Sequence, residues 1–94
     1  MAHGALVGDI GSAHDGYPAT PIISGSSTVK IDGKTVARKG DALAAHDKPH
    51  HPSHPRTIKE GSSTVMIDGL PAARVGDAVC CGGVIVGGSS VNIG

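Results

Sequence analysis

The sequence predicts an all-β domain built from three β-hairpin repeats. A nine-residue segment occurs twice, 36 residues apart (61 − 25), and a shortened copy ends the chain. Val, Ile and Thr dominate these segments, as strands favour, and no window shows sustained helical periodicity. Because the chain has only 94 residues, we expect one domain that spans residues 1–94.

Each repeat has two units, and their copies are arranged circularly along the chain. Copies of the first unit are GSSTVKIDG at 25–33, GSSTVMIDG at 61–69 and GSSVNIG at 88–94. Copies of the second unit are KTVARKGD at 34–41, LPAARVGD at 70–77 and ALVGD at 5–9. Leu6 stands where the other copies have arginine. Two repeats are therefore complete, and the third is split between the two ends of the chain.

Asp32-Gly33 and Asp68-Gly69 predict the two hairpin turns. Asp-Gly suits a two-residue type I′ turn, in which both residues need a positive φ. For the split repeat, we expect a strand at about 90–93 to pair with a strand at about 4–8. This pairing would close the three hairpins into a ring and remove exposed sheet edges.

The composition indicates a weak hydrophobic core. The chain has no Phe or Trp, one Tyr (Tyr17) and 15 glycines. Large apolar side chains contribute most to burial, about 1.5–3 kcal/mol each, and small domains often need a metal, disulfides or oligomerisation. Adjacent cysteines rarely bridge, so we expect a thiol or metal role for Cys80 and Cys81.

Charge and hydropathy exclude several classes of function. The net charge is zero, with eight basic and eight acidic side chains, and aromatic residues are nearly absent, so we expect no nucleic-acid binding. No apolar run approaches the roughly 20 residues of a membrane span. The first residues lack the basic start and apolar core of a signal peptide. We therefore expect a soluble protein that is made in the cytoplasm and leaves the cell, if at all, by a route that reads no cleavable signal.

A variable loop follows Gly-Asp in each repeat, and the middle loop is long enough to hold a short helical turn. The loops cover 10–24, 42–60 and 78–87. His14 and His46 each lie five residues after the aspartate of their repeat, and Cys81 lies four residues after its own. This common register predicts that each loop delivers one ligand to a shared metal ion.

The fourth ligand is expected from the middle loop, which holds His50, His51 and His54. Three imidazoles and one thiolate form a tetrahedral shell that suits Zn²⁺. Four protein ligands leave no open position for water or substrate, so the predicted zinc is structural. The competing interpretation is that the histidines are solvent-exposed or bind metal adventitiously, and that the cysteines are small buried hydrophobic residues. The repeated register favours zinc.

The sequence PAARVGD at 71–77 resembles the signature of PAAR-repeat proteins, and TVAR at 35–38 is similar to a degenerate second copy. Segments 61–69 and 81–86 also resemble this family, so the resemblance covers essentially the whole chain. The chain departs from the family pattern at Leu6 and in the TV of the second copy. Neither departure touches the predicted zinc ligands.

The resemblance implies a sharp, compact cone with three pseudo-symmetric sides and one zinc ion near its narrow point. Among the ligands of the family, the first-loop histidine matches His14, the second-loop histidine His46 and the third-loop cysteine Cys81. For the remaining ligand we choose His54, with His51 as the alternative.

The resemblance also implies a structural, non-enzymatic role. The broad base of such a cone caps a trimeric spike, which is VgrG in type VI secretion or its equivalent in contractile phage tails, as one monomer on a trimer. The cone sharpens the spike for piercing membranes rather than residing in them, and it can carry effector proteins out of the cell or into a target cell. We expect a bare cone whose toxin, if any, is supplied separately.

Two other classes of function stay open. A small zinc-dependent hydrolase would need an open coordination position and a cleft, and a metal-handling protein would release its zinc to weak chelators. If the chain caps a spike, its base needs apolar strand residues, and at least half of the candidates are expected to pack in the core instead. These candidates are Val29, Ile31, Val65, Ile67, Val91 and Ile93.

Overall fold

Short antiparallel β-strands joined by turns make up the described part of the chain. The structure is a computed structural model that describes residues 2–13, 17–48, 51–80 and 82–94, without the side chains of 46–48 and 51–54. Its strands are β1 (Ala2–His3), β2 (Ile10–Gly11), β3 (Thr20–Pro21), β4 (Lys30–Ile31), β5 (Lys34–Thr35), β6 (Ala42–Lys48), β7 (His51–Thr57), β8 (Met66–Ile67), β9 (Leu70–Pro71), β10 (Ile85–Val86) and β11 (Asn92–Ile93). The described residues contain no helix, so the all-β prediction is confirmed.

The two complete hairpins form where the Asp-Gly turns predict them. Strand β4 pairs with β5, and β8 pairs with β9. The φ angles are 53° at Asp32 and 77° at Gly33, and 54° at Asp68 and 79° at Gly69. Positive φ at both central residues is the mark of a type I′ turn, so the turn prediction is confirmed.

The two ends of the chain also pair with each other, as predicted. Ala2 lies opposite Ile93, and His3 lies opposite Asn92, in the β1–β11 pair. The first strand covers residues 2–3 rather than 4–8, because Gly4 still bonds Val91 and Ser89 but the backbone from Ala5 onward bonds to other repeats. The N–H of Ala5 donates to Ala73, and the N–H of Val7 donates to Thr35.

The middle loop differs from the prediction, because it folds into the longest hairpin of the molecule. Strands β6 and β7 pair over seven residues each, with two register shifts. Pro52 and Pro55 lie in β7 and favour a loop by sequence. In a two-stranded ribbon, however, each strand keeps one free edge, where the missing N–H of proline costs no ladder bond.

The other two loops also contribute strands. Strand β2 lies between β10 and β3 in a three-stranded sheet, with Gly11 opposite both Ile85 and Thr20. This sheet therefore joins the first and third loops. The predicted variable loops at 10–24 and 78–87 therefore contain short strands, which the sequence analysis did not predict.

A closed ring of three backbone hydrogen bonds joins the repeats at the centre of the fold. Ala5 N–H donates to the carbonyl of Ala73, Ala73 N–H to that of Ala37, and Ala37 N–H to that of Ala5, at 2.9, 3.0 and 2.9 Å. All three alanines are fully buried. The methyl side chain fits here because three backbones approach one another closely.

Each Gly-Asp sequence forms the same turn. The carboxylates of Asp9, Asp41 and Asp77 each accept the backbone N–H of the residue three positions earlier, at 2.8 Å. The N–H of each aspartate donates back to the carbonyl of that same residue. The preceding glycines have φ between 91° and 99°, which fits the third position of a type II turn.

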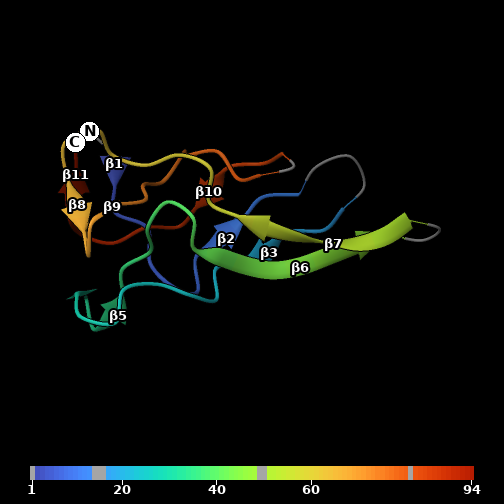
Figure 1. Cartoon of the computed structure of the whole chain (residues 1–94), viewed down its shortest axis with the longest axis horizontal. Coiled ribbons are helices and arrows are strands. Elements are labelled where there is room, and N and C mark those ends of the chain that lie inside the picture. Colours follow the sequence, from blue (N-terminus) through green and yellow to red (C-terminus); the bar gives the residue numbers. More distant parts are fainter. Residues whose placement is uncertain (1, 14–16, 49–50, 81) are drawn as a thin grey trace.

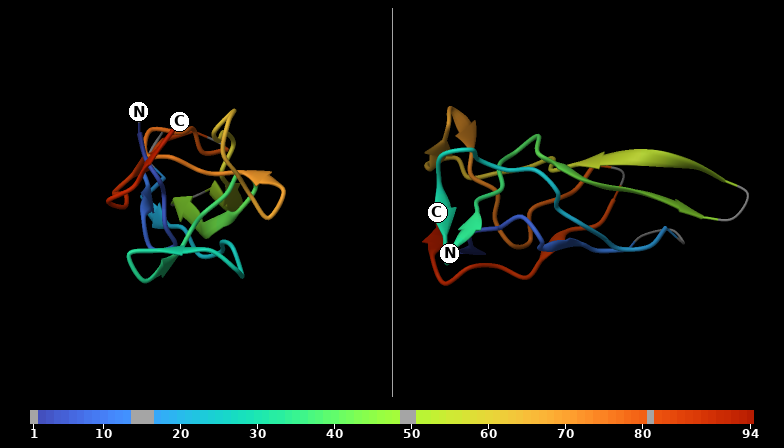
Figure 2. Two further views of the ribbon diagram at one scale, coloured as in Figure 1. Left: turned by 90° about the vertical axis from the view of Figure 1, so that its left-hand side faces the viewer. Right: turned by 90° about the horizontal axis from the view of Figure 1, so that it is seen from below.

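The molecule is elongated, with extents of 40 × 24 × 21 Å. The short hairpins and the paired chain ends lie at one end, and the β6–β7 hairpin extends toward the other (Figure 1). Seen along the long axis, the chain ends and the β4–β5 and β8–β9 hairpins spread around that axis (Figure 2). We call this the hairpin end, and it consists of β1, β4, β5, β8, β9 and β11 with their turns.

Two hydrophobic clusters of small and β-branched side chains fill the interior. One contains Ala5, Ile22, Ala37, Leu43, Ile58, Ala73, Val79 and Ile85. The other, nearer the hairpin end, contains Leu6, Val36, Ile67, Ala72 and Ile93. Leu6, which replaces an arginine of the repeat, is therefore a core residue.

Candidate functional site

The three loops are joined to one another in pairs. The first and third loops meet through β2 and β10, and Ser12 N–H donates to Val84 at 2.9 Å. The first and second loops meet at the Ile22–Leu43 bridge. Cys80 N–H donates to Thr57 at 2.8 Å and joins the third loop to the second. Backbone contacts therefore hold the three loops together, whereas the convergence of their predicted ligands on one ion stays a prediction.

The predicted metal ligands fall partly within the described residues. His46 and His54 lie directly opposite each other in the register of β6 and β7, whereas His51 lies opposite Lys48. The side chains of these histidines are outside the described part, and His14 and Cys81 lie outside it altogether. Among the described residues, no group of three or more His, Cys, Asp or Glu side chains is placed to hold a metal ion.

A buried arginine that the sequence analysis missed joins the loops. Arg56, at the end of β7, is only 1% exposed. Its Nη1 donates to the carbonyl of Gly11 at 2.9 Å and to Oγ1 of Thr20 at 3.0 Å. Its Nη2 donates to the carbonyls of Ser12 at 2.8 Å and Gly82 at 3.1 Å. One side chain from the second loop thus holds both of the other loops.

The repeat alignment contains a signal for this arginine. Counting back two residues from the buried isoleucines Ile22, Ile58 and Ile85 gives Thr20, Arg56 and Gly83. At these three equivalent positions, Thr20 and Gly83 are small and Arg56 is a long cation. This pattern indicates that the arginine side chain of the second repeat fills space that the small residues of the other two repeats leave open. The proline- and histidine-rich surroundings of Arg56 hid this pattern.

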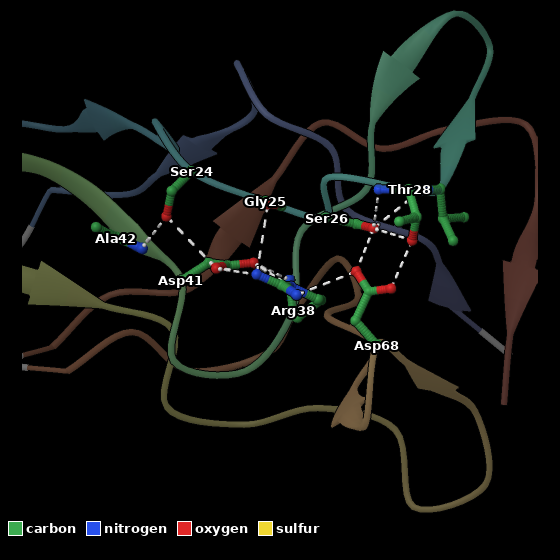
Figure 3. A network of polar contacts seen from close by, with 9 residues as sticks. Ser24, Gly25, Ser26, Thr28, Arg38, Asp41, Ala42 and Asp68 are labelled. Carbon is green, nitrogen blue, oxygen red and sulfur yellow. Dashed lines mark hydrogen bonds and ion pairs between the residues drawn. The ribbon is translucent and has the colours of Figure 1, made fainter.

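The hairpin end carries a second polar network, centred on Arg38 (Figure 3). The Nε and Nη2 of Arg38 hold both carboxylate oxygens of Asp41, at 3.0 and 3.1 Å. Its Nη1 reaches Oδ2 of Asp68 in the next hairpin at 3.2 Å. Asp68 also accepts the hydroxyls of Ser26 and Thr28, each at 2.5 Å. These hydroxyls first, and then Arg38, lower the pKa of Asp68.

Arg74 repeats this arrangement. Its Nε and Nη2 hold Asp77 at 3.1 and 2.9 Å, and these hydrogen bonds raise the pKa of Arg74. Its Nη1 donates to the carbonyl of Gly94 at 3.3 Å, and Ser62 donates to the same oxygen. In the third repeat, Leu6 stands at the position of Arg38 and Arg74 and supplies no cation. The turn aspartate that would face it, Asp32, instead accepts the backbone N–H and the hydroxyl of Ser90, both at 2.8 Å.

Apolar side chains are exposed at the hairpin end. Met66 on β8, Leu70 on β9 and Val91 before β11 are 56%, 40% and 44% exposed. Of the six candidate base residues, Ile67 and Ile93 are buried, and Val29, Ile31 and Val65 pack against the same cluster. The expectation that at least half of them belong to the core is confirmed.

Comparison with protein families assigns the chain. The model of the PAAR motif matches residues 10–87. The chain belongs to the PAAR-motif family. A search of curated proteins found no match. The PAAR motif associates the chain with the spikes of type VI secretion systems and phage tails, where the family is structural.

The contacts of residues 71–74 show what the two alanines and the arginine of the PAAR motif do in the fold. The carbonyl of Pro71, at the end of β9, accepts the N–H of Lys39. Ala72 is fully buried in the cluster near the hairpin end, and Ala73 belongs to the alanine ring. Arg74 clamps the aspartate of the following turn. The PAAR motif therefore combines close packing at the centre with one inter-repeat cation.

No helix in the described part of this PAAR-motif chain is long and apolar enough to cross a membrane.

Proposed function

We propose that the chain is the tip of a contractile injection machine. It caps and sharpens a trimeric VgrG-like spike for membrane piercing and effector delivery, and it acts without catalysing a reaction. Membership of the PAAR-motif family carries this proposal. The ring of hydrogen bonds among Ala5, Ala37 and Ala73 supports a matching geometry, because three like bonds around one centre would suit a threefold partner.

The hairpin end is the proposed base of the cone. The β4–β5 and β8–β9 hairpins and the paired chain ends spread around the long axis there (Figure 2), and Met66, Leu70 and Val91 offer apolar surface to a partner. The opposite end, with the three loops and the β6–β7 hairpin, is the proposed piercing tip. One chain would then sit on three spike subunits.

We further propose one structural zinc ion at the loop end, held by His14, His46, His54 and Cys81. The donor set suits zinc. The described neighbours of these ligands support convergence, since Ser12, Gly82 and Arg56 are joined by hydrogen bonds. Residues paired across antiparallel strands have Cβ atoms about 5 Å apart, so the His46–His54 register favours His54 over His51. When bound, the ion would cross-link the loops and stabilise a fold that has few large apolar side chains.

Two measurements test the proposal. Elemental mass spectrometry of tag-free protein should find one zinc ion per chain. Native mass spectrometry with a purified trimeric VgrG-like spike should find one chain per trimer. Met66→Asp should weaken this complex, because it places a charge at the base. Ile23→Asp is the matched control, since Ile23 is equally exposed, at 58%, but lies outside the hairpin end. Equal binding by both variants would refute the assignment of the base.

A further inference from the structure

The backbone of the first and third loops packs closely around the side chain of Arg56, which leaves little room for a different side chain. Its guanidinium bonds four oxygen atoms that belong to two other loops. A Cβ atom at Gly83 would lie 2.9 Å from Nη2 of Arg56 and 2.5 Å from the carbonyl of Ser12. A Cβ atom at Gly11 would lie 3.1 Å from Nη1. The surrounding backbone is therefore fitted closely to this one side chain.

The positions of the acceptors relate Arg56 to the proposed zinc ligands. Ser12 lies two residues before His14, and Gly82 directly follows Cys81. Arg56 itself lies two residues after His54. The oxygen atoms held by Arg56 thus belong to the chain segments that lead to ligands in the first and third loops.

The chemistry of arginine suits this task. A buried cation is costly unless its donors are satisfied, and backbone carbonyls at fixed positions supply acceptors. The guanidinium is planar, always charged and able to donate in several fixed directions at once. An ammonium group has three donors around a single atom, so it cannot reach the Gly11–Thr20 pair and the Ser12–Gly82 pair together.

We infer that Arg56 is a positioning residue that holds the three ligand-bearing loops in place before the metal ion binds. This inference rests on the zinc site proposed above. Without Arg56, the ion would have to gather the loops itself, and ordering them would cost part of the binding free energy. Arg56 therefore raises zinc affinity without contributing a ligand atom.

The test compares Arg56→Lys with Arg74→Lys in the full chain. Both variants shorten an arginine that joins repeats, but Arg74 bonds Asp77, Gly61 and Gly94 near the hairpin end. Competition with a chromogenic chelator measures zinc affinity, and the visible spectrum of the Co²⁺-loaded protein reports the ligand geometry. We expect Arg56→Lys to bind zinc about 10- to 100-fold more weakly, the usual effect of losing a residue that orients metal ligands. Its Co²⁺ bands should also shift, whereas Arg74→Lys should lower thermal stability and leave both readouts unchanged.

A milder variant keeps the test decisive if Arg56→Lys does not fold. Thr20→Val removes one acceptor of Nη1 and keeps the shape of the side chain, and it should weaken zinc binding about tenfold. The inference would be overturned, with the zinc site left intact, if Arg56→Lys and Thr20→Val both bind zinc as tightly as the wild type. Arg74→Lys, the control, should bind it equally tightly in either case. A wild-type chain that binds no zinc would overturn both.

Discussion

The side chain of Arg38 joins its own repeat to the β8–β9 hairpin, with its Nη1 3.2 Å from Oδ2 of Asp68, a residue 30 positions later in the sequence. The same guanidinium holds Asp41 within its own repeat. The aspartate of each Asp-Gly turn therefore has two roles. It provides the positive φ that the turn needs, and it accepts hydrogen bonds from the neighbouring repeat.

Asp68→Asn should destabilise the fold more than Asp32→Asn. Both oxygens of Asp68 accept bonds, and the Ser26 hydroxyl is committed as a donor to Asp68 because its oxygen accepts the N–H groups of Thr28 and Val29. In Asp68→Asn, the amide oxygen can accept Ser26 and Arg38 while the NH₂ group faces Thr28, but the ion pair with Arg38 is lost. At Asp32, the Ser90 hydroxyl can reverse and accept from the amide. We expect thermal denaturation to show a loss of a few degrees for Asp68→Asn and little change for Asp32→Asn. Equal losses would contradict the assigned network.

The stability of zinc-free protein should fall in strong acid. Hydrogen bonds from Ser26 and Thr28, and then the charge of Arg38, lower the pKa of Asp68 from its ordinary value of 3.8. A carboxyl with a lowered folded-state pKa contributes stability that is fully present above the unfolded-state pKa and is lost as the pH falls through the folded-state pKa. Thermal melts in chelator should therefore decline below about pH 4, and the decline should be shallower in Asp68→Asn. An unchanged slope in that variant would show that other carboxyls dominate.

Ala37→Leu should disrupt the centre of the fold. Ala37 is fully buried and bonds Ala5 and Ala73 through its backbone, so added methylene groups have no space. Overpacking of this kind costs about 1–3 kcal/mol of unfolding free energy, which chemical denaturation can measure. Ala19→Leu, at an exposed position, is the control and should change the free energy little. A tolerated leucine at 37 would mean that the ring can open.

Comparing Gly83→Ala with Gly76→Ala separates the cost of a strained backbone from the cost of a Cβ atom that clashes with its neighbours. Their φ angles are 90° and 91°, so each alanine costs about 1–2 kcal/mol for the left-handed conformation. Nothing lies within 4 Å of a Cβ at Gly76, whereas a Cβ at Gly83 meets the Ser12 carbonyl and Arg56. We expect Gly83→Ala to lose about 1–3 kcal/mol more and to bind zinc more weakly. Equal unfolding free energies would contradict the tight fit around Arg56.

Cys81→Ser should lose the metal ion, and Cys80→Ser should keep it. Cys80 is exposed and its backbone N–H bonds Thr57, so a serine there leaves the loop connection intact. Removing a thiolate ligand should lower the melting temperature to that of chelator-treated protein. Elemental analysis and thermal melts check both variants, and similar metal content in the two would exclude the proposed register.

The sequence predicted features that depend on local turn chemistry. Asp32-Gly33 and Asp68-Gly69 predicted the two type I′ hairpins, and the circular repeat predicted the pairing of the chain ends. Features that depend on tertiary contacts escaped prediction. The β6–β7 hairpin contains prolines that a two-stranded ribbon tolerates. The hydrogen bonds from Arg56 to Gly11, Ser12, Thr20 and Gly82 reach residues more than 25 positions away.

The same limit applies to the candidate site. The common register of His14, His46 and Cys81 with their Gly-Asp turns pointed to three loops that the structure joins in pairs. It gave no indication of what holds those loops together. It also left His51 and His54 as alternatives, because the pairing of His54 with His46 depends on register shifts within β6–β7.

The ring of alanines constrains how the chain reaches its native state. Each of its bonds joins residues 32 to 68 positions apart (37 − 5, 73 − 37 and 73 − 5). Strand β1 can pair only after its partner strand at residues 92–93 is available. Loop-closure entropy must therefore be overcome before most contacts can form, which slows folding. No repeat can complete its backbone pairing alone, so we expect a single late, cooperative folding step after the last repeat has left the ribosome.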